Sequence, residues 1–183
     1  TAAVALTMLF VAGTRVRFLI PTLLLGASGF VFAVMHNPVR WQRIMAFADP
    51  VGTAQGAGYQ TWQSLLAFGS GGLFGRGLGN SGAKFFYLPE ARTDFILAIV
   101  GEELGLLGAL VVVVAFAVLL FSGLRIALRA RELFGSLLAL GITSLLGFQA
   151  LINIGVVTGS LPNKGLPLPF ISYGGSNLVM NLI

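Results

Sequence analysis

The stretch LFGSLLALGITSLLGFQALINIGVV, Leu133–Val157, decides the fold, because it contains no charged side chain over its whole length. A helix needs about 20 consecutive apolar residues to cross the hydrocarbon core of a bilayer. This run is long enough to do so with some tilt. The sequence therefore predicts an all-α fold, a polytopic bundle of transmembrane helices with a long structured extracellular loop.

The composition supports the same class of protein. Hydrophobic residues make up 56% of the 183 residues and charged residues only 9%, whereas soluble domains carry about 25% charged residues. The chain has no cysteine, which excludes disulfides and cysteine-ligated metal sites. Its basic residues are scattered singly or in pairs, unlike the basic runs that bind nucleic acid.

Other uncharged runs give the remaining spans. Both ends of the sequence fall inside apolar stretches, so we expect residues 1–183 to be a fragment of a single, longer integral membrane domain. We expect membrane spans at about residues 1–13 (partial), 18–36, 94–122, 133–157 and 172–183 (partial), with outer loops at 37–93 and 158–171.

Arginine density orients these spans. The short loops Thr14–Arg17 and Leu124–Glu132 hold five arginines, whereas the two much longer loops share six basic residues. The positive-inside rule gives short loops the most weight, so we expect the short loops to be cytoplasmic and the long loops to face outward. Within the first outer loop, Tyr59–Phe68 has the pattern of an amphipathic helix that lies on the membrane surface.

The first outer loop also contains a glycine-rich segment, Gly69–Asn80. It resembles a phosphate-binding loop only superficially, because no strand precedes it and no Gly-Lys-Ser/Thr follows. Glycine allows close backbone approach and positive φ angles. We therefore expect a tightly packed turn beside a substrate groove.

Two acidic motifs follow this segment. Asp94 ends the run YLPEARTD at the expected membrane boundary, where Thr93 or Asp94 can cap the next helix and Asp94 can alternatively accept a proton from a sugar hydroxyl. Glu102 and Glu103 lie deeper, where ionisable groups usually face a bundle interior or a cavity. Two interpretations stay open for this pair: an ion pair with a cation on a helix outside this chain, or contact with substrate.

The second outer loop, SLPNKGLPLPFISYGGS, has three prolines that hold its shape. Lys164 supplies a cation, and Ser172, Tyr173 and Ser176 open the next helix, whose free N–H groups favour anions. A re-entrant loop that only packs and caps is the alternative.

Three long motifs, in this order, resemble the SEDS family (shape, elongation, division and sporulation; FtsW/RodA/SpoVE) of peptidoglycan glycosyltransferases, specifically its carboxy-terminal half. They lie within Gly58–Ser81, Tyr87–Gly108 and Leu161–Ser176. The LPNKG form of the last motif favours the FtsW-like branch. Members usually have histidine where this chain has Arg92.

The resemblance implies an enzyme of the bacterial cytoplasmic membrane that polymerises lipid II into glycan at the outer face, for cell division or cell shape. Its essential aspartate corresponds to Asp94, the expected general base of an inverting transfer from an undecaprenyl-pyrophosphate-linked donor. A divalent cation (Mg or Mn) could assist the pyrophosphate, although no metal cluster is evident. Expected partners are a class B penicillin-binding protein, other divisome or elongasome proteins and membrane lipids. The expected substrate-binding residues are Arg76, Lys84, Glu90, Arg92, Lys164, Ser172, Tyr173 and Ser176, with Glu102 and Glu103 as structural or site-supporting residues.

Two other functions compete with this one. A lipid-linked precursor flippase would explain the Glu102 and Glu103 pair, but it should carry polar residues across the bilayer, and the spans below Glu103 are almost wholly apolar. A non-catalytic scaffold for a transpeptidase would make Asp94 only a helix cap.

The predicted orientation can be tested on the cysteine-free sequence by labelling. Cysteines placed at Gly72 and Asn163 should react with a membrane-impermeant thiol reagent in intact cells, and a cysteine at Ala130 should react only after the membrane is opened. The opposite labelling pattern would contradict the outward assignment of every motif above.

Overall fold

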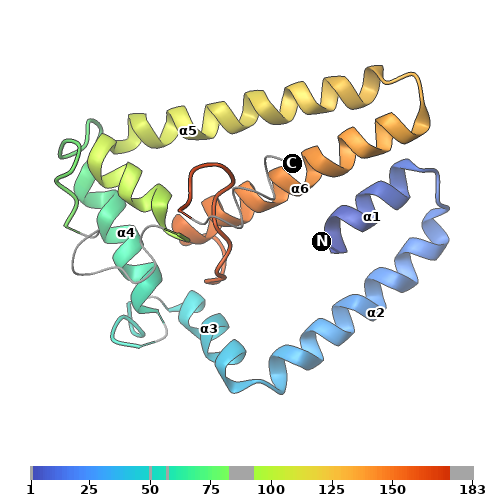
Figure 1. Cartoon of the computed structure of the whole chain (residues 1–183). Helices are drawn as coiled ribbons and strands as arrows, with labels where there is room; N and C mark the ends of the chain where they lie inside the picture. The colour runs from blue at the N-terminus through green and yellow to red at the C-terminus, as the bar shows by residue number, and fades with distance from the viewer. Residues whose placement is uncertain (1, 50, 57, 83–92, 174–183) are drawn as a thin grey trace. The chain divides into compact units, whose positions relative to one another are not determined.

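The computed structural model describes residues 2–49, 51–56, 58–82 and 93–173. All regular secondary structure in these ranges is helical, which confirms the predicted all-α class (Figure 1). The helices are α1 (Ala2–Val11), α2 (Val16–Met35), α3 (Pro38–Ala48), α4 (Tyr59–Gly71), α5 (Ile96–Arg129) and α6 (Leu133–Val157).

Three of the described helices, α2, α5 and α6, are long and apolar enough to cross a membrane. Few of their side chains are buried within the chain; Leu25 on α2, for example, is 76% exposed. So much contiguous apolar surface is incompatible with water, and the protein is therefore a membrane protein. Helix α6 has the same bounds as the run that predicted it, whereas the last expected span lies outside the described residues beyond Tyr173.

The outer loop expected over residues 37–93 contains two helices. Helix α4 extends the predicted amphipathic segment to Gly71, while α3 was not predicted. The start of α3 follows local chemistry: Asn37 Oδ1 accepts hydrogen bonds from the N–H groups of Val39 (3.1 Å) and Arg40 (3.3 Å). Asn37 therefore acts as an N-cap, and Pro38 occupies the first helical position, where its missing N–H costs nothing.

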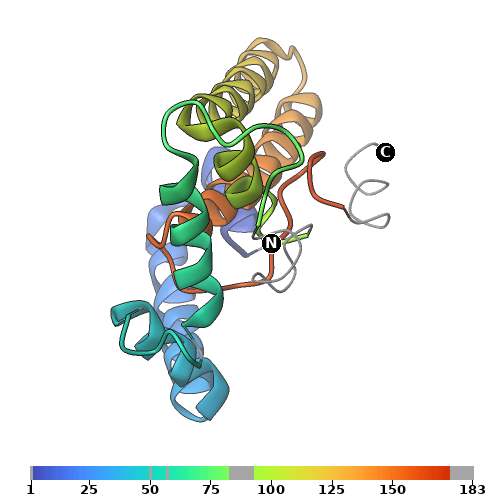
Figure 2. The same ribbon diagram turned by 90° about the vertical axis from the view of Figure 1, so that its left-hand side faces the viewer.

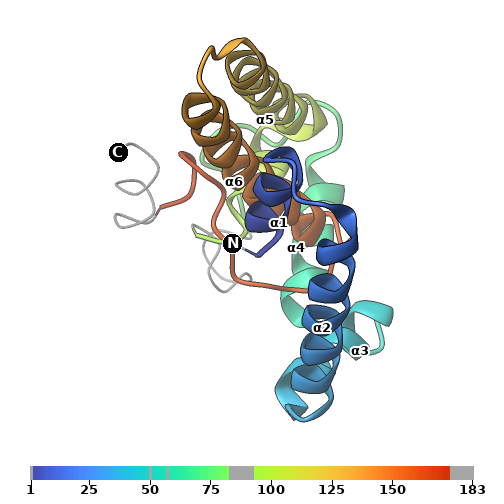
Figure 3. The same ribbon diagram turned by 90° about the vertical axis from the view of Figure 1, so that its right-hand side faces the viewer.

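The chain forms two compact units. The first comprises residues 1–41 and 116–148, and in it the adjoining parts of α5 and α6 form an antiparallel hairpin (Figure 3). Small residues let these helices approach closely: a Cβ atom at Gly123 would lie 2.2 Å from Thr143 Oγ1. Ser136 Oγ donates to Ala127 O (2.8 Å) across the turn of the hairpin.

The second unit comprises residues 42–115 and 149–183 and contains the functional motifs. Its main feature is a break in α5 at Gly105, which has φ 72° and ψ −168°. The span expected to be continuous over residues 94–122 is thus two helical pieces. The second piece, Leu106–Arg129, is about 36 Å long at 1.5 Å per residue and can cross a bilayer core by itself.

A broken helix exposes backbone groups that lack partners, and the glycine-rich segment supplies the partners here. On the first side of the break, the N–H of Arg76 donates to Glu102 O and the N–H of Gly77 donates to Glu103 O, both at 3.0 Å. The segment therefore pairs with the carbonyl groups that the end of the first piece leaves open.

The same segment pairs with the other side of the break. The N–H of Leu106 donates to Gly72 O (2.9 Å), and the N–H of Leu107 donates to Leu73 O (3.3 Å). We call this set of four main-chain hydrogen bonds the backbone interlock. Figure 2 shows the segment running from the end of α4 beside the first part of α5.

The backbone interlock requires glycine at its closest approaches. A Cβ atom at Gly75 would lie 2.1 Å from Glu103 O, one at Gly105 would lie 2.4 Å from Gly75 N, and one at Gly71 would lie 2.0 Å from Gly101 O. Main-chain atoms cannot move aside as a flexible side chain can. The predicted tight glycine-rich turn is therefore present, and its partner is the break in α5.

We expect Gly75→Ala to destabilise the purified full-length protein strongly, because it adds a collision with main-chain atoms to the strain of a positive φ angle (81°). Overpacking costs about 1–3 kcal/mol beyond the roughly 1–2 kcal/mol of the left-handed conformation. Gly79→Ala is the matched control, because Gly79 has φ 84° but no atom within 4 Å of the added carbon. Equal thermal unfolding temperatures for the two variants would contradict the interlock.

Candidate functional site

Asp94 lies half-buried at the start of α5, and its backbone is fixed from two directions. Ser172 Oγ donates a 2.5 Å hydrogen bond to Thr93 O, and Asn153 Nδ2 donates a 2.8 Å hydrogen bond to Asp94 O. Helix α5 begins at Ile96, two residues after Asp94 and later than expected, so the side chain of Asp94 does not immediately precede the first helical residue.

Asn153 is a central residue of this region. Its side chain is 2% exposed, and its amide nitrogen also donates to Leu166 O (2.7 Å). Carbonyl oxygens only accept hydrogen bonds, so Asp94 O and Leu166 O must face the NH2 group of Asn153. This fixes the orientation of the Asn153 side-chain amide. Asn153 thereby joins α6, the start of α5 and the proline-rich loop (residues 158–173).

Three further contacts hold the proline-rich loop. Gln149, one helical turn before Asn153, donates from Nε2 to Pro167 O (3.0 Å). Asn163 donates from its amide to Gln60 Oε1 at the start of α4. The Ser64 hydroxyl of α4 donates to Val157 O (2.8 Å), which ties α4 to the end of α6.

This anchoring brings Gly165 directly against the carboxylate of Asp94. A methyl group at position 165 would lie 2.9 Å from Asp94 Oδ2. The preceding residue, Lys164, is exposed. The structure therefore places the main chain of the proline-rich loop, one residue after Lys164, beside the candidate base.

The interpretation of the sequence missed Gln149 and Asn153. Their signal was available, because amide side chains four residues apart share one face of a helix and polar residues inside an apolar span usually hydrogen-bond to neighbouring segments. The absence of charge, which identifies the membrane span, does not single out these two amides.

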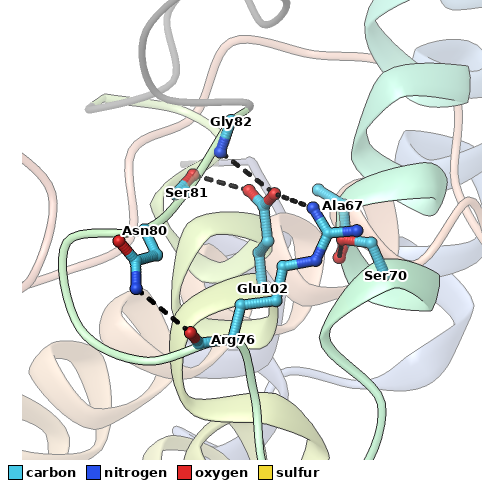
Figure 4. Close-up of polar contacts among 7 residues, drawn as sticks. All are labelled: Ala67, Ser70, Arg76, Asn80, Ser81, Gly82 and Glu102. Atoms are coloured by element: carbon cyan, nitrogen blue, oxygen red, sulfur yellow. Dashed lines mark hydrogen bonds and ion pairs between the residues drawn. The ribbon is translucent and has the colours of Figure 1, made fainter.

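Glu102 is buried (3% exposed) at the end of the first piece of α5, and it binds the glycine-rich segment (Figure 4). Its carboxylate accepts hydrogen bonds from Ser81 Oγ (2.5 Å) and from the N–H of Gly82 (3.1 Å), and Arg76 Nη1 lies 3.5 Å away. The cation expected on a helix outside this chain is therefore present within it, on the segment that forms the interlock. The side chain of Arg76 is 53% exposed, so its attraction to Glu102 is screened by solvent.

Glu103 lines a different space. A cavity of about 500 Å³ runs along the first piece of α5. Its lining is mostly aliphatic, with one carboxylate and one tyrosine: Leu78, Ile96, Ile99, Val100, Glu103, Leu104, Ile171 and Tyr173. The cavity can accommodate a flexible apolar chain, and its first lining residue on α5, Ile96, follows Asp94 by two positions in the sequence.

Ser172, predicted to bind substrate, is instead buried and hydrogen-bonded within the chain. Ser172 is 4% exposed; its hydroxyl donates to Thr93 O and accepts from the N–H of Leu168 (2.7 Å), so it acts as a structural link here. Among the described residues, no group of three or more His, Cys, Asp or Glu side chains could hold a metal ion. Four predicted residues lie outside the described part of the chain: Lys84, Glu90, Arg92 and Ser176.

Comparisons with known proteins agree with the motif pattern. The family model FTSW_RODA_SPOVE, described as "Cell cycle protein", matches residues 1–183. "Probable peptidoglycan glycosyltransferase FtsW" of Geobacter metallireducens is 52% identical over 98% of this chain and 48% of its own length. "Stage V sporulation protein E" of Bacillus subtilis is 51% identical over 97% of this chain and 49% of its own length.

A solved structure has the same fold. It is described as "Structural coordination of polymerization and crosslinking by a peptidoglycan synthase complex", and one of its chains aligns with a TM-score of 0.70 and 27% identity. The alignment covers 96% of this chain and 48% of that one. The present chain thus spans about half the length of the curated relatives it matches, and it belongs to the FtsW/RodA/SpoVE family.

Proposed function

We propose that the protein is a peptidoglycan glycosyltransferase that polymerises lipid II at the outer face of the bacterial cytoplasmic membrane. The observation that carries this proposal is the position of Asp94: its half-buried carboxylate lies against Gly165, a residue that follows the exposed Lys164 in the proline-rich loop. A relative named as a probable peptidoglycan glycosyltransferase, 52% identical over nearly the whole chain, supports it.

Asp94 acts in this proposal as the general base. The 4-hydroxyl oxygen of the acceptor sugar attacks the anomeric carbon of the donor and forms the new C–O bond, while its proton passes to the Asp94 carboxylate. The bond between the anomeric carbon and the pyrophosphate oxygen breaks, and the pyrophosphate leaves with the electron pair. Direct displacement of this kind inverts the anomeric centre.

The leaving group requires positive charge nearby, because a lipid pyrophosphate gains negative charge as it departs. Lys164 is the proposed cation, because it directly precedes Gly165, the residue that lies against the Asp94 carboxylate. Lys84 and Arg92 remain further candidates. Since the described residues offer no cluster of metal ligands, we assign no step to a metal ion, and assistance by a divalent cation remains a prediction from the sequence.

The apolar cavity fits a lipid-linked substrate. Its aliphatic lining, from Ile96 to Leu104 along one face of the first piece of α5, would hold part of an isoprenoid chain while the sugar stays near Asp94. A class B penicillin-binding protein is the proposed partner, since the matched solved structure is described as a complex that coordinates polymerization and crosslinking. Relatives of the division and sporulation branches match almost equally well, so the FtsW-like assignment remains a prediction.

The flippase alternative depends on the acidic pair in α5. Glu102 is held by two hydrogen bonds and an ion pair within the chain, which suits a fixed structural group better than a carboxylate that must exchange partners during transport. The scaffold alternative treats Asp94 as a cap. The start of α5 at Ile96 and the contact between Asp94 and the loop glycine favour a site over a cap.

We expect Asp94→Asn to abolish most of the polymerisation of lipid II by the full-length protein assayed with its transpeptidase. The amide keeps the size of the side chain but cannot accept the proton, and loss of an acid–base group costs roughly 10²–10⁴-fold in rate. Membrane insertion, thermal stability and binding of the transpeptidase should stay as in the wild type.

Thr93→Ala is the matched control for this test. It changes the neighbouring side chain but leaves the carboxylate and the backbone carbonyl that accepts from Ser172. We expect at most a small loss of stability and little loss of glycan synthesis. Polymerisation near the wild-type rate by purified Asp94→Asn protein would end the proposed role of this residue.

Glu102→Gln should act mainly on stability. The amide has one acceptor oxygen instead of two, so either Ser81 or Gly82 loses its acceptor, and a hydrogen bond to a charged group contributes about 1.5–3 kcal/mol. Thermal unfolding of the purified variant measures this, and Glu132→Gln, at an exposed carboxylate, is the control. A Glu102→Gln protein as stable as the wild type but as inactive as Asp94→Asn would place Glu102 in the catalytic site.

A further inference from the structure

We infer that Gly165 is a positioning residue for the carboxylate of Asp94, and that its lack of a side chain is what lets the carboxylate occupy its place. This inference rests on the proposed function, because it concerns the base of that reaction. Gly165 has no side chain that could take part in the reaction itself. Its contribution is the space beside its Cα atom.

The geometry at Gly165 differs from that at Gly75 and Gly105 in the interlock. The nearest atoms to an added methyl group are Asp94 Oδ2 at 2.9 Å and Asp94 Cγ at 3.7 Å. The first distance, from carbon to oxygen, is shorter than the 3.4 Å at which ordinary van der Waals contact of a Cβ atom begins. The two nearest obstacles thus both belong to the carboxyl group of Asp94, whereas those at Gly75 are main-chain atoms of α5.

The backbone of Gly165 does not itself demand glycine. Its φ angle lies outside the left-handed range, unlike those of Gly75, Gly77, Gly79 and Gly159. Alanine can therefore adopt the same backbone conformation. The substitution should not destabilise the fold through backbone strain, because alanine loses less conformational entropy on folding than glycine. The collision has to be relieved by the most flexible group present, which is the Asp94 side chain.

Relief by movement of the loop is opposed on both sides of Gly165. Asn163 is hydrogen-bonded to Gln60, and Leu166 O accepts from Asn153. The same Asn153 amide nitrogen holds Asp94 O, so the backbones on both sides of the gap share one buried anchor. A side chain at position 165 would consequently rotate the carboxylate away rather than push the loop outward.

The test compares Gly165→Ala with Asp94→Asn and with the double variant, in the full-length protein with its transpeptidase. The carboxylate oxygen has to move by about 0.5 Å to reach an ordinary contact distance. Because displacement of a catalytic group by about 1 Å can cost on the order of 10²-fold, we expect kcat of Gly165→Ala to fall roughly 10-fold. KM for lipid II and the thermal unfolding temperature should stay close to the wild-type values. Gly56→Ala is the matched control, because the only atom near its added carbon is Thr53 O at an ordinary 3.8 Å.

The double variant separates positioning from any effect of loop packing. If Gly165 acts through the carboxylate, adding Gly165→Ala to Asp94→Asn should cause no further loss of rate, because interacting sites are not additive. A full additional loss in the double variant, or normal kcat in Gly165→Ala beside an inactive Asp94→Asn, would overturn the inference and leave the proposed function intact. An active Asp94→Asn protein would instead contradict the proposed function itself.

Discussion

The backbone interlock at Gly105 is the constraint on which the second unit depends. Inside a membrane, a helix can break only where other groups satisfy the backbone N–H and C=O groups that the break leaves open. The glycine-rich segment does this on both sides, through four main-chain hydrogen bonds. An unsatisfied buried group costs about 1–3 kcal/mol, so the segment and the break are stable only together. Glu102 adds a side-chain link to the two residues that follow this segment, Ser81 and Gly82.

The break gives the first piece of α5 two functions. At its start, Asn153 and Ser172 fix the backbone beside Asp94, and at its end, Glu102 and the interlock fix the glycine-rich segment. A short rigid piece with both ends anchored is a suitable support for a catalytic carboxylate, because reacting groups must be held in place to within a fraction of an ångström. The remainder of α5 is long enough to cross a bilayer core, and its first residues, Leu106 and Leu107, contribute two of the hydrogen bonds of the interlock.

Much of the architecture could be predicted from the sequence, because membrane spans follow from length and charge alone. The uncharged run Leu133–Val157 gave the bounds of α6, and Tyr59–Phe68 indicated most of α4. The break at Gly105 could not be predicted, because glycine is common in membrane helices and its φ angle depends on a distant partner. Asp94 is predicted as a site residue from its motif. Asn153, which anchors the same region, could not be singled out, because only its burial and its hydrogen bonds in three dimensions distinguish it from other polar residues in helices.

The interlock also has a consequence for biosynthesis. Every hydrogen bond in it joins the break to residues 72–77, which leave the ribosome before α5 does. The groups that complete the broken helix are therefore already present when its two pieces enter the bilayer, and no later segment has to arrive to satisfy them. Because the contacts are made by the main chain, they tolerate exchange of neighbouring side chains such as Leu73 and Phe74, which are exposed. The order of assembly is thus set by the main chain of residues 72–77, which precede α5 in the sequence.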